Sequence, residues 1–265
     1  MCLLALAFRI HPEAPIVIAA NRDEWLAREA EPMQVLRPAA PRILGGRDVP
    51  SGGTWLAVNE HGVCAGLANR PSPGGRDPSR RSRGELPFLL AQHSKAERAV
   101  LAFEKAVVCT HYNPCWLLVC DRTALFYIVV GDDTEPVVTR LPPGLHVLGN
   151  DPLGHPSPKV EMVCRALTPI CRWSGPVLLN ELCRVLRSHD VPALSASRDL
   201  RYGAVRWPPE IHAACVHTAA YGTRSATMIV VPPEVDCAPK VFYADGPLCR
   251  SPLVDMSELW PVSSG

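Results

Sequence analysis

The chain has 265 residues, of which 47% are hydrophobic and 20% are charged, a composition that is typical of globular proteins. A chain of this length buries a substantial core without the help of disulfides or metal ions, so we expect a single domain over residues 1–265. The formal net charge of +1 excludes a general electrostatic attraction to nucleic acids or anionic membranes.

The N-terminal sequence and the cysteines indicate a compartment. No stretch of 18 or more apolar residues occurs, which argues against a transmembrane helix. The apolar stretch at residues 2–8 is short, has no basic region before it and ends at Arg9, unlike a secretory signal. The eleven cysteines include no Cys-x-x-Cys pair. We therefore expect a cytoplasmic protein with reduced core thiols.

An apolar hairpin opens the chain. Residues 3–10 and 16–20 are predicted strands, and the proline-bearing segment 11–15 is the turn between them. In an antiparallel pair of similar length, the start of the first strand lies beside the end of the second. We therefore expect Cys2 and the polar segment 21–23 at the same end of a sheet.

Glycine-rich turns and short strands follow the hairpin. The pattern predicts turns at 44–48 and 51–55 and strands at 55–58 and 63–67, joined by a hairpin turn at 59–62. Residues 70–83 are rich in Pro, Ser, Gly and Arg and predict a long loop. One helix is expected over 88–106, with Leu89 and Leu101 on its buried side.

The second half of the chain alternates blocks of strands with helices. The pattern predicts strands at 116–120, 125–130, 137–140 and 146–149, helices at 159–166 and 177–186, a strand pair at 213–217 and 227–231 around a turn at 221–224, and an edge strand at 241–243. Strand-rich blocks with helices between them favour an α+β class over alternating βαβ units.

Cys2 is the first candidate for chemistry. Methionine aminopeptidase removes Met1 when the next side chain is small, and the mature chain would then begin with a thiol and a free α-amine on one residue. A thiol titrates near about 8.5 and an α-amine near about 7.7–8.0, so this residue can be nucleophile and general base at once. The alternative interpretation is that Cys2 is a small core hydrophobe.

Charged residues follow the second predicted strand in the segment 21–25, Asn-Arg-Asp-Glu-Trp. A carboxylate such as Asp23 would hold the α-amine in place, and a cation such as Arg22 would favour the thiolate. The alternative is a solvated turn at the end of a strand.

Three further polar residues end or connect predicted strands. Asn69 and Asn150 each follow an apolar strand, where a side-chain amide is able to donate to a developing oxyanion. Arg224 lies in the predicted turn at 221–224 and is a candidate anion anchor. Each also has a plain interpretation as a turn or surface residue.

The histidines show no His-Glu-x-x-His or other paired spacing, so we expect no metal site, and no cofactor motif is present.

Seven stretches together carry a family resemblance. They are Met1-Cys2, 20–24 (Ala-Asn-Arg-Asp-Glu), 52–56 (Gly-Gly-Thr-Trp-Leu), 66–69 (Gly-Leu-Ala-Asn), 83–86 (Arg-Gly-Glu-Leu), 148–150 (Leu-Gly-Asn) and 221–224 (Tyr-Gly-Thr-Arg). The chain resembles the NRDE family, the group that includes the transport and Golgi organisation protein 2 of animals. That family is similar to the cysteine N-terminal nucleophile (Ntn) hydrolases, such as penicillin V acylase and bile salt hydrolase.

The resemblance implies a four-layer αββα sandwich and a set of site residues. By residue-to-residue transfer, Cys2 would be the nucleophile, Asp23 would orient its amine, Asn69 and Asn150 would be oxyanion or amine-side ligands, and Arg224 would lie behind the thiol. One position departs from the enzymes. The arginine of their Arg-Asn-x-Asp segment falls on Ala20, and Arg22 occupies a position between.

Two functions from different classes follow. The first is hydrolysis of C–N bonds in a small-molecule amide or acyl ligand through Cys2. The second is a non-catalytic carrier on the same scaffold that binds haem or an acyl ligand, since members of the family are linked to haem trafficking and Golgi organisation. His11, His61 or His217 would be an axial ligand in that case, although no spacing selects one. A protein that acts through surface contacts alone would leave the polar cluster unexplained.

Overall fold

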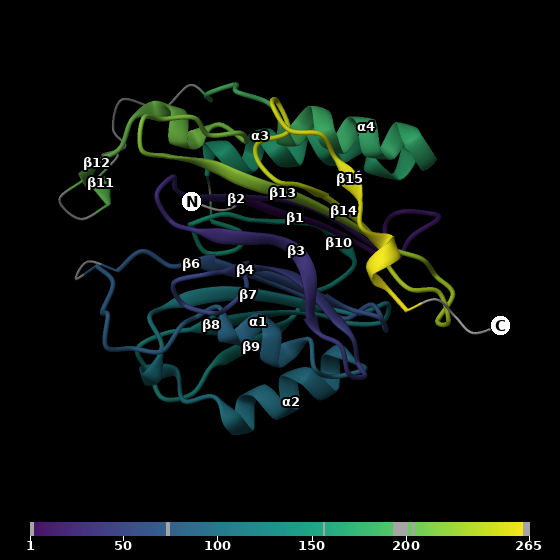
Figure 1. Cartoon of the computed structure of the whole chain (residues 1–265), viewed down its shortest axis with the longest axis horizontal. Coiled ribbons are helices and arrows are strands. Elements are labelled where there is room, and N and C mark those ends of the chain that lie inside the picture. Colours follow the sequence, from purple (N-terminus) through teal and green to yellow (C-terminus); the bar gives the residue numbers. More distant parts are fainter. Residues whose placement is uncertain (1–2, 73–74, 156, 193–200, 203–204, 262–265) are drawn as a thin grey trace.

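Two antiparallel β-sheets lie face to face, and each carries helices on its outer side (Figure 1). The computed structural model describes residues 3–72, 75–155, 157–192, 201–202 and 205–261. Cys2 therefore lies outside the described residues. No helix in these ranges is both long and apolar enough to cross a bilayer.

The first sheet contains the N-terminal hairpin at its centre. Its strand order is β10 (Gly144–Leu148), β1 (Leu3–Phe8), β2 (Ile16–Trp25), β13 (Tyr221–Val231), β14 (Lys240–Ala244) and β15 (Val254–Asp255). The helices α3 (Pro158–Leu167) and α4 (Gly175–Leu186) cover its outer face, at the top of Figure 1.

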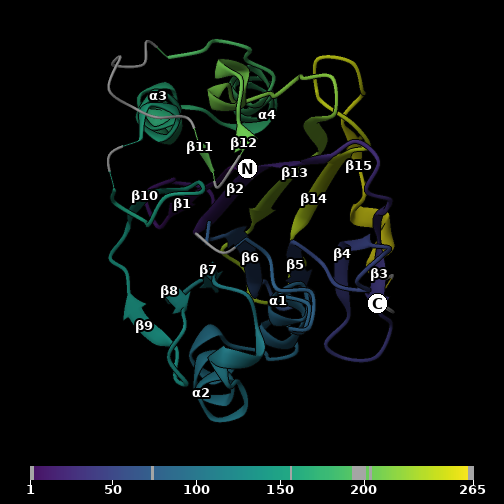
Figure 2. The same ribbon diagram turned by 90° about the vertical axis from the view of Figure 1, so that its left-hand side faces the viewer.

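The second sheet is a seven-stranded meander in chain order. It consists of β3 (Ala30–Arg37), β4 (Ile43–Asp48), β5 (Leu56–Asn59), β6 (Cys64–Asn69), β7 (Cys115–Cys120), β8 (Leu125–Val130) and β9 (Val137–Arg140). The helices α1 (Glu85–Leu90) and α2 (Ala96–Ala106) cover its outer face, as Figure 2 shows from the side. A separate two-stranded ribbon pairs β11 (Arg201–Tyr202) with β12 (Val205–Arg206).

Three apolar layers fill the spaces between these elements. Alternate residues of β1 point to opposite faces of the sheet. Leu4 and Leu6 pack between the two sheets, whereas Leu3 and Ala5 pack against α3 and α4. Because both faces are covered, every residue of β1 is buried. The order helix, sheet, sheet, helix confirms the predicted α+β class and αββα sandwich.

The register of the first sheet places the start of β1 between two polar segments. Leu3 pairs with Asn21 of β2, and Leu4 pairs with Leu148 of β10. Arg22 and Asp23 therefore lie at the same end of the sheet as the start of β1. This confirms the expected juxtaposition as far as Leu3, where the described part of the hairpin begins.

The second strand of the hairpin is longer than predicted. The sequence placed its end at residue 20, because burying a charged side chain costs free energy unless it is paired. β2 instead continues to Trp25 with Asn21, Arg22 and Asp23 all buried. The alternative interpretation of a solvated turn is therefore wrong for residues 21–23, because each of these three side chains finds buried partners in other elements.

The predicted single helix over 88–106 is two helices. Asp121 accepts a hydrogen bond from the backbone N–H of Ala96 at 2.7 Å, which fixes the start of α2 after a break. Leu101 is 58% exposed and Leu89 is 36% exposed, so their predicted burial was also wrong.

Other boundaries also differ from the prediction. Residues 44–48, expected as a turn, belong to β4, and β3 was not predicted. The predicted turn at 221–224 is the first part of β13, and residues 213–217 contribute only the isolated bridge between His217 and Gly222 within the described structure. The predicted edge strand at 241–243 is β14, which β15 covers.

Candidate functional site

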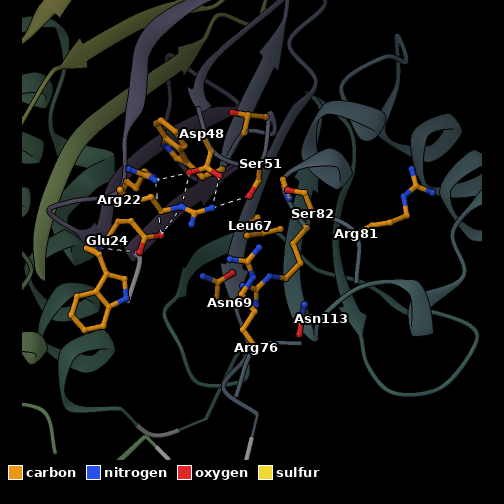
Figure 3. Close-up of a pocket in the computed structure, with 16 residues that line it drawn as sticks. Arg22, Glu24, Asp48, Ser51, Leu67, Asn69, Arg76, Arg81, Ser82 and Asn113 are labelled. Atoms are coloured by element: carbon orange, nitrogen blue, oxygen red, sulfur yellow. Dashed lines mark hydrogen bonds and ion pairs between the residues drawn. The ribbon is translucent and has the colours of Figure 1, made fainter. Parts of the chain in front are cut away.

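A cleft of about 270 Å³ opens between the two sheets at the end where β1 begins (Figure 3). β2, β4 and β6 contribute to its walls, and the loop that runs from Arg76 to Gly84 lines the other side. Arg22 and Asn69, two of the predicted site residues, both line it.

Arg22 faces the space between the sheets. It follows Ile18 and Ala20 on the same side of β2, and both of those residues pack in the core between the sheets. The Arg22 guanidinium lies 4.4 Å from the centre of the Trp55 ring, and its Nη2 is 3.2 Å from Asp48 Oδ1. Its Nη1 is buried with no hydrogen-bond partner in the described structure.

Ala20 and Arg22 share one face of β2, because side chains alternate along a strand. Arg22 therefore places its charge in the same space between the sheets as Ala20, two residues farther along β2. An unpaired buried donor next to a cleft is a ready hydrogen-bonding group for a ligand.

Asp48 holds two arginines in the cleft wall. Its Oδ1 accepts from Arg28 Nε at 2.7 Å, and its Oδ2 accepts from Arg28 Nη2 at 2.6 Å. This hydrogen-bonded pairing raises the pKa of Arg28. Glu24 lies within 3.9 Å of both guanidinium groups. Asp48 was not predicted as a site residue, because it lies in a segment whose glycines are typical of a turn.

Asp23 faces the opposite side of β2, toward the helices. Its Oδ2 lies 3.1 Å from Lys159 Nζ in α3, and its Oδ1 accepts a 2.6 Å hydrogen bond from Thr223 Oγ1. The backbone oxygen of Asp23 accepts from the Tyr221 hydroxyl at 2.8 Å. Asp23 is thus held in place by α3 and β13, through two partners, Lys159 and Thr223, that were not predicted from the sequence.

A hydrogen bond joins the two predicted asparagines across the sheets. Asn150 follows β10 and donates from Nδ2 to the backbone oxygen of Asn69 at the end of β6, at 2.8 Å. Asn150 is 9% exposed, and its Oδ1 has no hydrogen-bond partner in the described structure. The pair therefore leaves one buried acceptor at the end of the sheet where β1 begins.

Arg224 lies apart from the intersheet cleft. The register between β2 and β13 shifts between Thr223 and Ser225, so Arg224 is the extra residue of a β-bulge. Its Nη1 donates to the backbone oxygens of Trp25 and Leu26. The side chain lines a second cavity with His217 and Arg250.

Three arginines of the 70–83 segment line the cleft, although the side chain of Arg81 points away from it (Figure 3). Arg76, Arg81 and Arg83 line it, as does Asn113, which holds the loop through Asp77. Figure 3 shows Asn69 and Arg76 together on the side of the cleft opposite Asp48. The side chain of Arg81 pairs with Glu85 at 2.6 Å. The positive charge of this wall favours ligands that carry an anionic group.

The profile of the family described as "Transport and Golgi organisation 2" matches residues 1–238 of the chain. The chain belongs to this family. The transport and Golgi organization 2 homolog of Mus musculus is 28% identical over 254 residues, which cover 87% of this chain and 88% of the mouse protein. The Homo sapiens homolog is 27% identical over 249 residues, with the same coverage of both chains. The NRDE resemblance is thereby confirmed.

Solved structures share the fold of this family member. A C2A mutant of conjugated bile acid hydrolase from Clostridium perfringens superposes with a TM-score of 0.54 at 11% identity, covering 97% of this chain and 93% of the hydrolase. The Caenorhabditis elegans ortholog of N-acylethanolamine-hydrolyzing acid amidase gives a TM-score of 0.52 at 13% identity, covering 89% of this chain and 97% of the amidase. The chain therefore has the fold of the cysteine Ntn hydrolases.

Proposed function

We propose that the protein hydrolyses C–N bonds of small-molecule amides, with Cys2 as the nucleophile after removal of Met1. The observation that carries this proposal is the Asn69–Asn150 hydrogen bond beside the start of β1. It connects the end of β10 to the end of β6, where Asn69 lines the cleft, and it leaves Asn150 Oδ1 as a buried acceptor with no partner among the described residues. A buried acceptor of this kind fits an α-amine or the N–H of an amide substrate.

The proposed reaction begins with proton transfer from the Cys2 thiol to its own α-amine. The thiolate attacks the amide carbon, and the α-ammonium then protonates the leaving nitrogen as the C–N bond breaks. Water attacks the resulting thioester and loses a proton to the amine, which releases the carboxylic acid and restores the thiol. Asn69, which lines the cleft, is proposed to donate to the oxyanion.

The neighbouring charged residues support this chemistry in different ways. We assign Asp23 the role of orienting the α-amine, since Lys159 and Thr223 keep its carboxylate fixed. Arg22 lines the cleft, and its Nη1 has no hydrogen-bond partner among the described residues. Its positive charge would stabilise a thiolate or an oxyanion. Arg224 is assigned a positioning role, because it holds the carbonyls that follow β2.

A panel of amides tests the proposal. It would compare acyl amides that carry a carboxylate with neutral ones, because the arginine-lined wall favours an anionic group. Mass spectrometry of the purified protein would first establish that Met1 is absent. We expect turnover by the wild-type chain, loss of turnover in Cys2→Ala, and an unchanged rate in Cys237→Ser, which alters an exposed cysteine.

Two results would overturn the proposal. One is retention of Met1 on the active protein, because the α-amine would then not be free. The other is equal turnover by the wild-type chain and Cys2→Ala. Asn69→Ala refines the assignment, since loss of one oxyanion donor lowers kcat by roughly 10²–10³.

Haem carriage, the second function considered from the sequence, stays a prediction. Among the described residues that line the intersheet cleft, none is a histidine or cysteine. His11 is bound to the backbone oxygen of Trp173, and His217 lies beside the second cavity. Titration with haemin distinguishes the two functions. A stoichiometric absorbance change that survives Cys2→Ala, without any amide turnover, would favour the carrier.

A further inference from the structure

Two cysteines and two histidines converge outside the intersheet cleft. They are His189, which follows α4, Cys215 and His217, which precede β13, and Cys249, which follows β14. One potential ligand atom from each residue lies within 4.8 Å of every other. Neither the family nor the proposed amide chemistry accounts for this cluster.

The separations among the ligand atoms of Cys215, His217 and Cys249 are close to the edges of a tetrahedral zinc site. The Cys215 and Cys249 sulfurs are 3.9 Å apart, and His217 Nε2 lies 3.6 Å from Cys215 Sγ and 3.2 Å from Cys249 Sγ. Zinc bonds of about 2.3 Å to sulfur and about 2.0–2.1 Å to nitrogen imply edges of about 3.8 Å between sulfurs and about 3.5 Å between sulfur and nitrogen.

We propose that His189, Cys215, His217 and Cys249 bind one Zn²⁺ ion in a tetrahedral Cys₂His₂ site. Thiolate and imidazole ligands in this ratio are typical of zinc. Four protein ligands leave no open coordination position for a substrate, so the site is structural. Two thiolates balance the charge of the ion.

Hydrogen bonds already hold the ligands in place. His189 Nδ1 lies 3.2 Å from the backbone oxygen of Cys215, and donation to this oxygen would leave Nε2 free for the metal. The backbone N–H of Cys215 donates to Ser188 O at 2.8 Å, which fixes the two segments relative to each other. Cys249 lies in a turn closed by two hydrogen bonds to Pro247 O.

The cluster also lies close to the candidate catalytic carboxylate. Val216, between two of the ligands, donates its N–H to Thr223 Oγ1 at 2.9 Å, and that hydroxyl donates to Asp23 Oδ1 at 2.6 Å. A metal ion would therefore link three chain segments. The Thr223 hydroxyl would connect one of these segments to Asp23. Zinc binding itself does not require Cys2, so this inference stands apart from the proposed hydrolysis.

Metal analysis of the full chain, purified under reducing conditions and without a histidine tag, tests the proposal. We expect one zinc per chain. Replacement by Co²⁺ should give the intense visible bands of tetrahedral cobalt and a sulfur-to-cobalt charge-transfer band. Cys249→Ser and His189→Ala alter exposed side chains, so they should fold. Each should weaken zinc binding by more than the roughly 10–100-fold effect of losing an outer-shell partner.

Matched controls use exposed residues of the same types. Cys237→Ser and His61→Ala should keep full zinc content and an unchanged cobalt spectrum. The proposal fails if the wild-type chain binds no stoichiometric zinc, or if Cys249→Ser binds it as tightly as the wild type. A disulfide between Cys215 and Cys249 that persists in reducing buffer, detected by peptide mass spectrometry, would also overturn it.

Discussion

Lys159 and Asp23 form an ion pair that is almost completely buried, with Nζ 3.1 Å from Oδ2 and side-chain exposures of 4% and 0%. Lys159 lies in the first turn of α3, where the helix dipole is unfavourable to a positive charge. Asp23 compensates for that position and connects the helix layer to β2. The pair therefore connects Asp23, a candidate site residue on β2, to helix α3.

Replacing Lys159 with Met should destabilise the protein by about 3–5 kcal/mol, because an uncompensated charge would remain buried on Asp23. Urea denaturation would measure the change in the free energy of unfolding. The control Lys105→Met alters an exposed lysine of α2 and should shift stability by less than about 0.5 kcal/mol. Equal effects of the two substitutions would contradict a specific role for the pair.

The double variant Lys159→Met with Asp23→Asn should be more stable than the sum of the single effects predicts, because it removes both charges together. Additive losses in the double-mutant cycle would show that the two side chains do not interact. The same variants should lower amide turnover if Asp23 orients the α-amine.

Asp48→Asn should cost about 1.5–3 kcal/mol of stability, because hydrogen bonds from Arg22 and Arg28 to a charged acceptor would be weakened. The substitution also makes the cleft more positive. The control Asp132→Asn changes a side chain that is 74% exposed and should have little effect. An Asp48→Asn protein as stable as wild type would mean that the arginines find other partners.

Gly53 and Gly84 meet backbone to backbone beside the cleft. A Cβ on Gly53 would lie 2.6 Å from Gly84 Cα, and Thr54 N donates to Gly84 O at 2.9 Å. Gly53→Ala and Gly84→Ala should therefore displace the Arg76–Gly84 loop and cost about 1–3 kcal/mol. Thermal unfolding would measure this cost. Gly131→Ala, whose Cβ would have its nearest neighbour at 3.6 Å, should be tolerated, and a similar loss there would refute the packing argument.

Alkaline pH should destabilise the fold through Cys115. This thiol is fully buried, and burial raises its pKa to about 12. An unfolded cysteine titrates near about 8.5, so the unfolded state binds fewer protons above that pH and gains stability relative to the folded state. The stabilising contribution of the protonated Cys115 thiol is fully present below about pH 8.5 and is lost as the pH rises toward 12.

Equilibrium unfolding at a series of pH values from 8 upward would measure how the free energy of unfolding depends on pH. Cys115→Ala should show a shallower decline in unfolding free energy with pH than the wild type, despite a packing loss at neutral pH. The control Cys171→Ala, which changes an exposed thiol, should keep the wild-type slope. Identical slopes for wild type and Cys115→Ala would exclude the buried thiol as the cause.

Apolar periodicity in the sequence was enough to predict β1, β7, β8 and the two helices that cover the first sheet. Fully buried strands appear as continuous apolar runs, and those runs are visible without a partner. The family resemblance also implied the sandwich and pointed to Arg22, Asp23, Asn69 and Asn150 as candidate site residues, although Arg22 and Asp23 lie within β2 and not after it. For the first hairpin, strand length alone was sufficient to bring the start of β1 to the polar end of β2.

Contacts between distant segments decided the rest. β2 extends through charged residues because Asp48 and Lys159, 26 and 136 positions away from their partners, neutralise them. The four residues of the proposed zinc site lie on three segments, so no local spacing revealed them. Burial of a charge becomes favourable only with a partner in place, and the partner's position is a property of the folded chain.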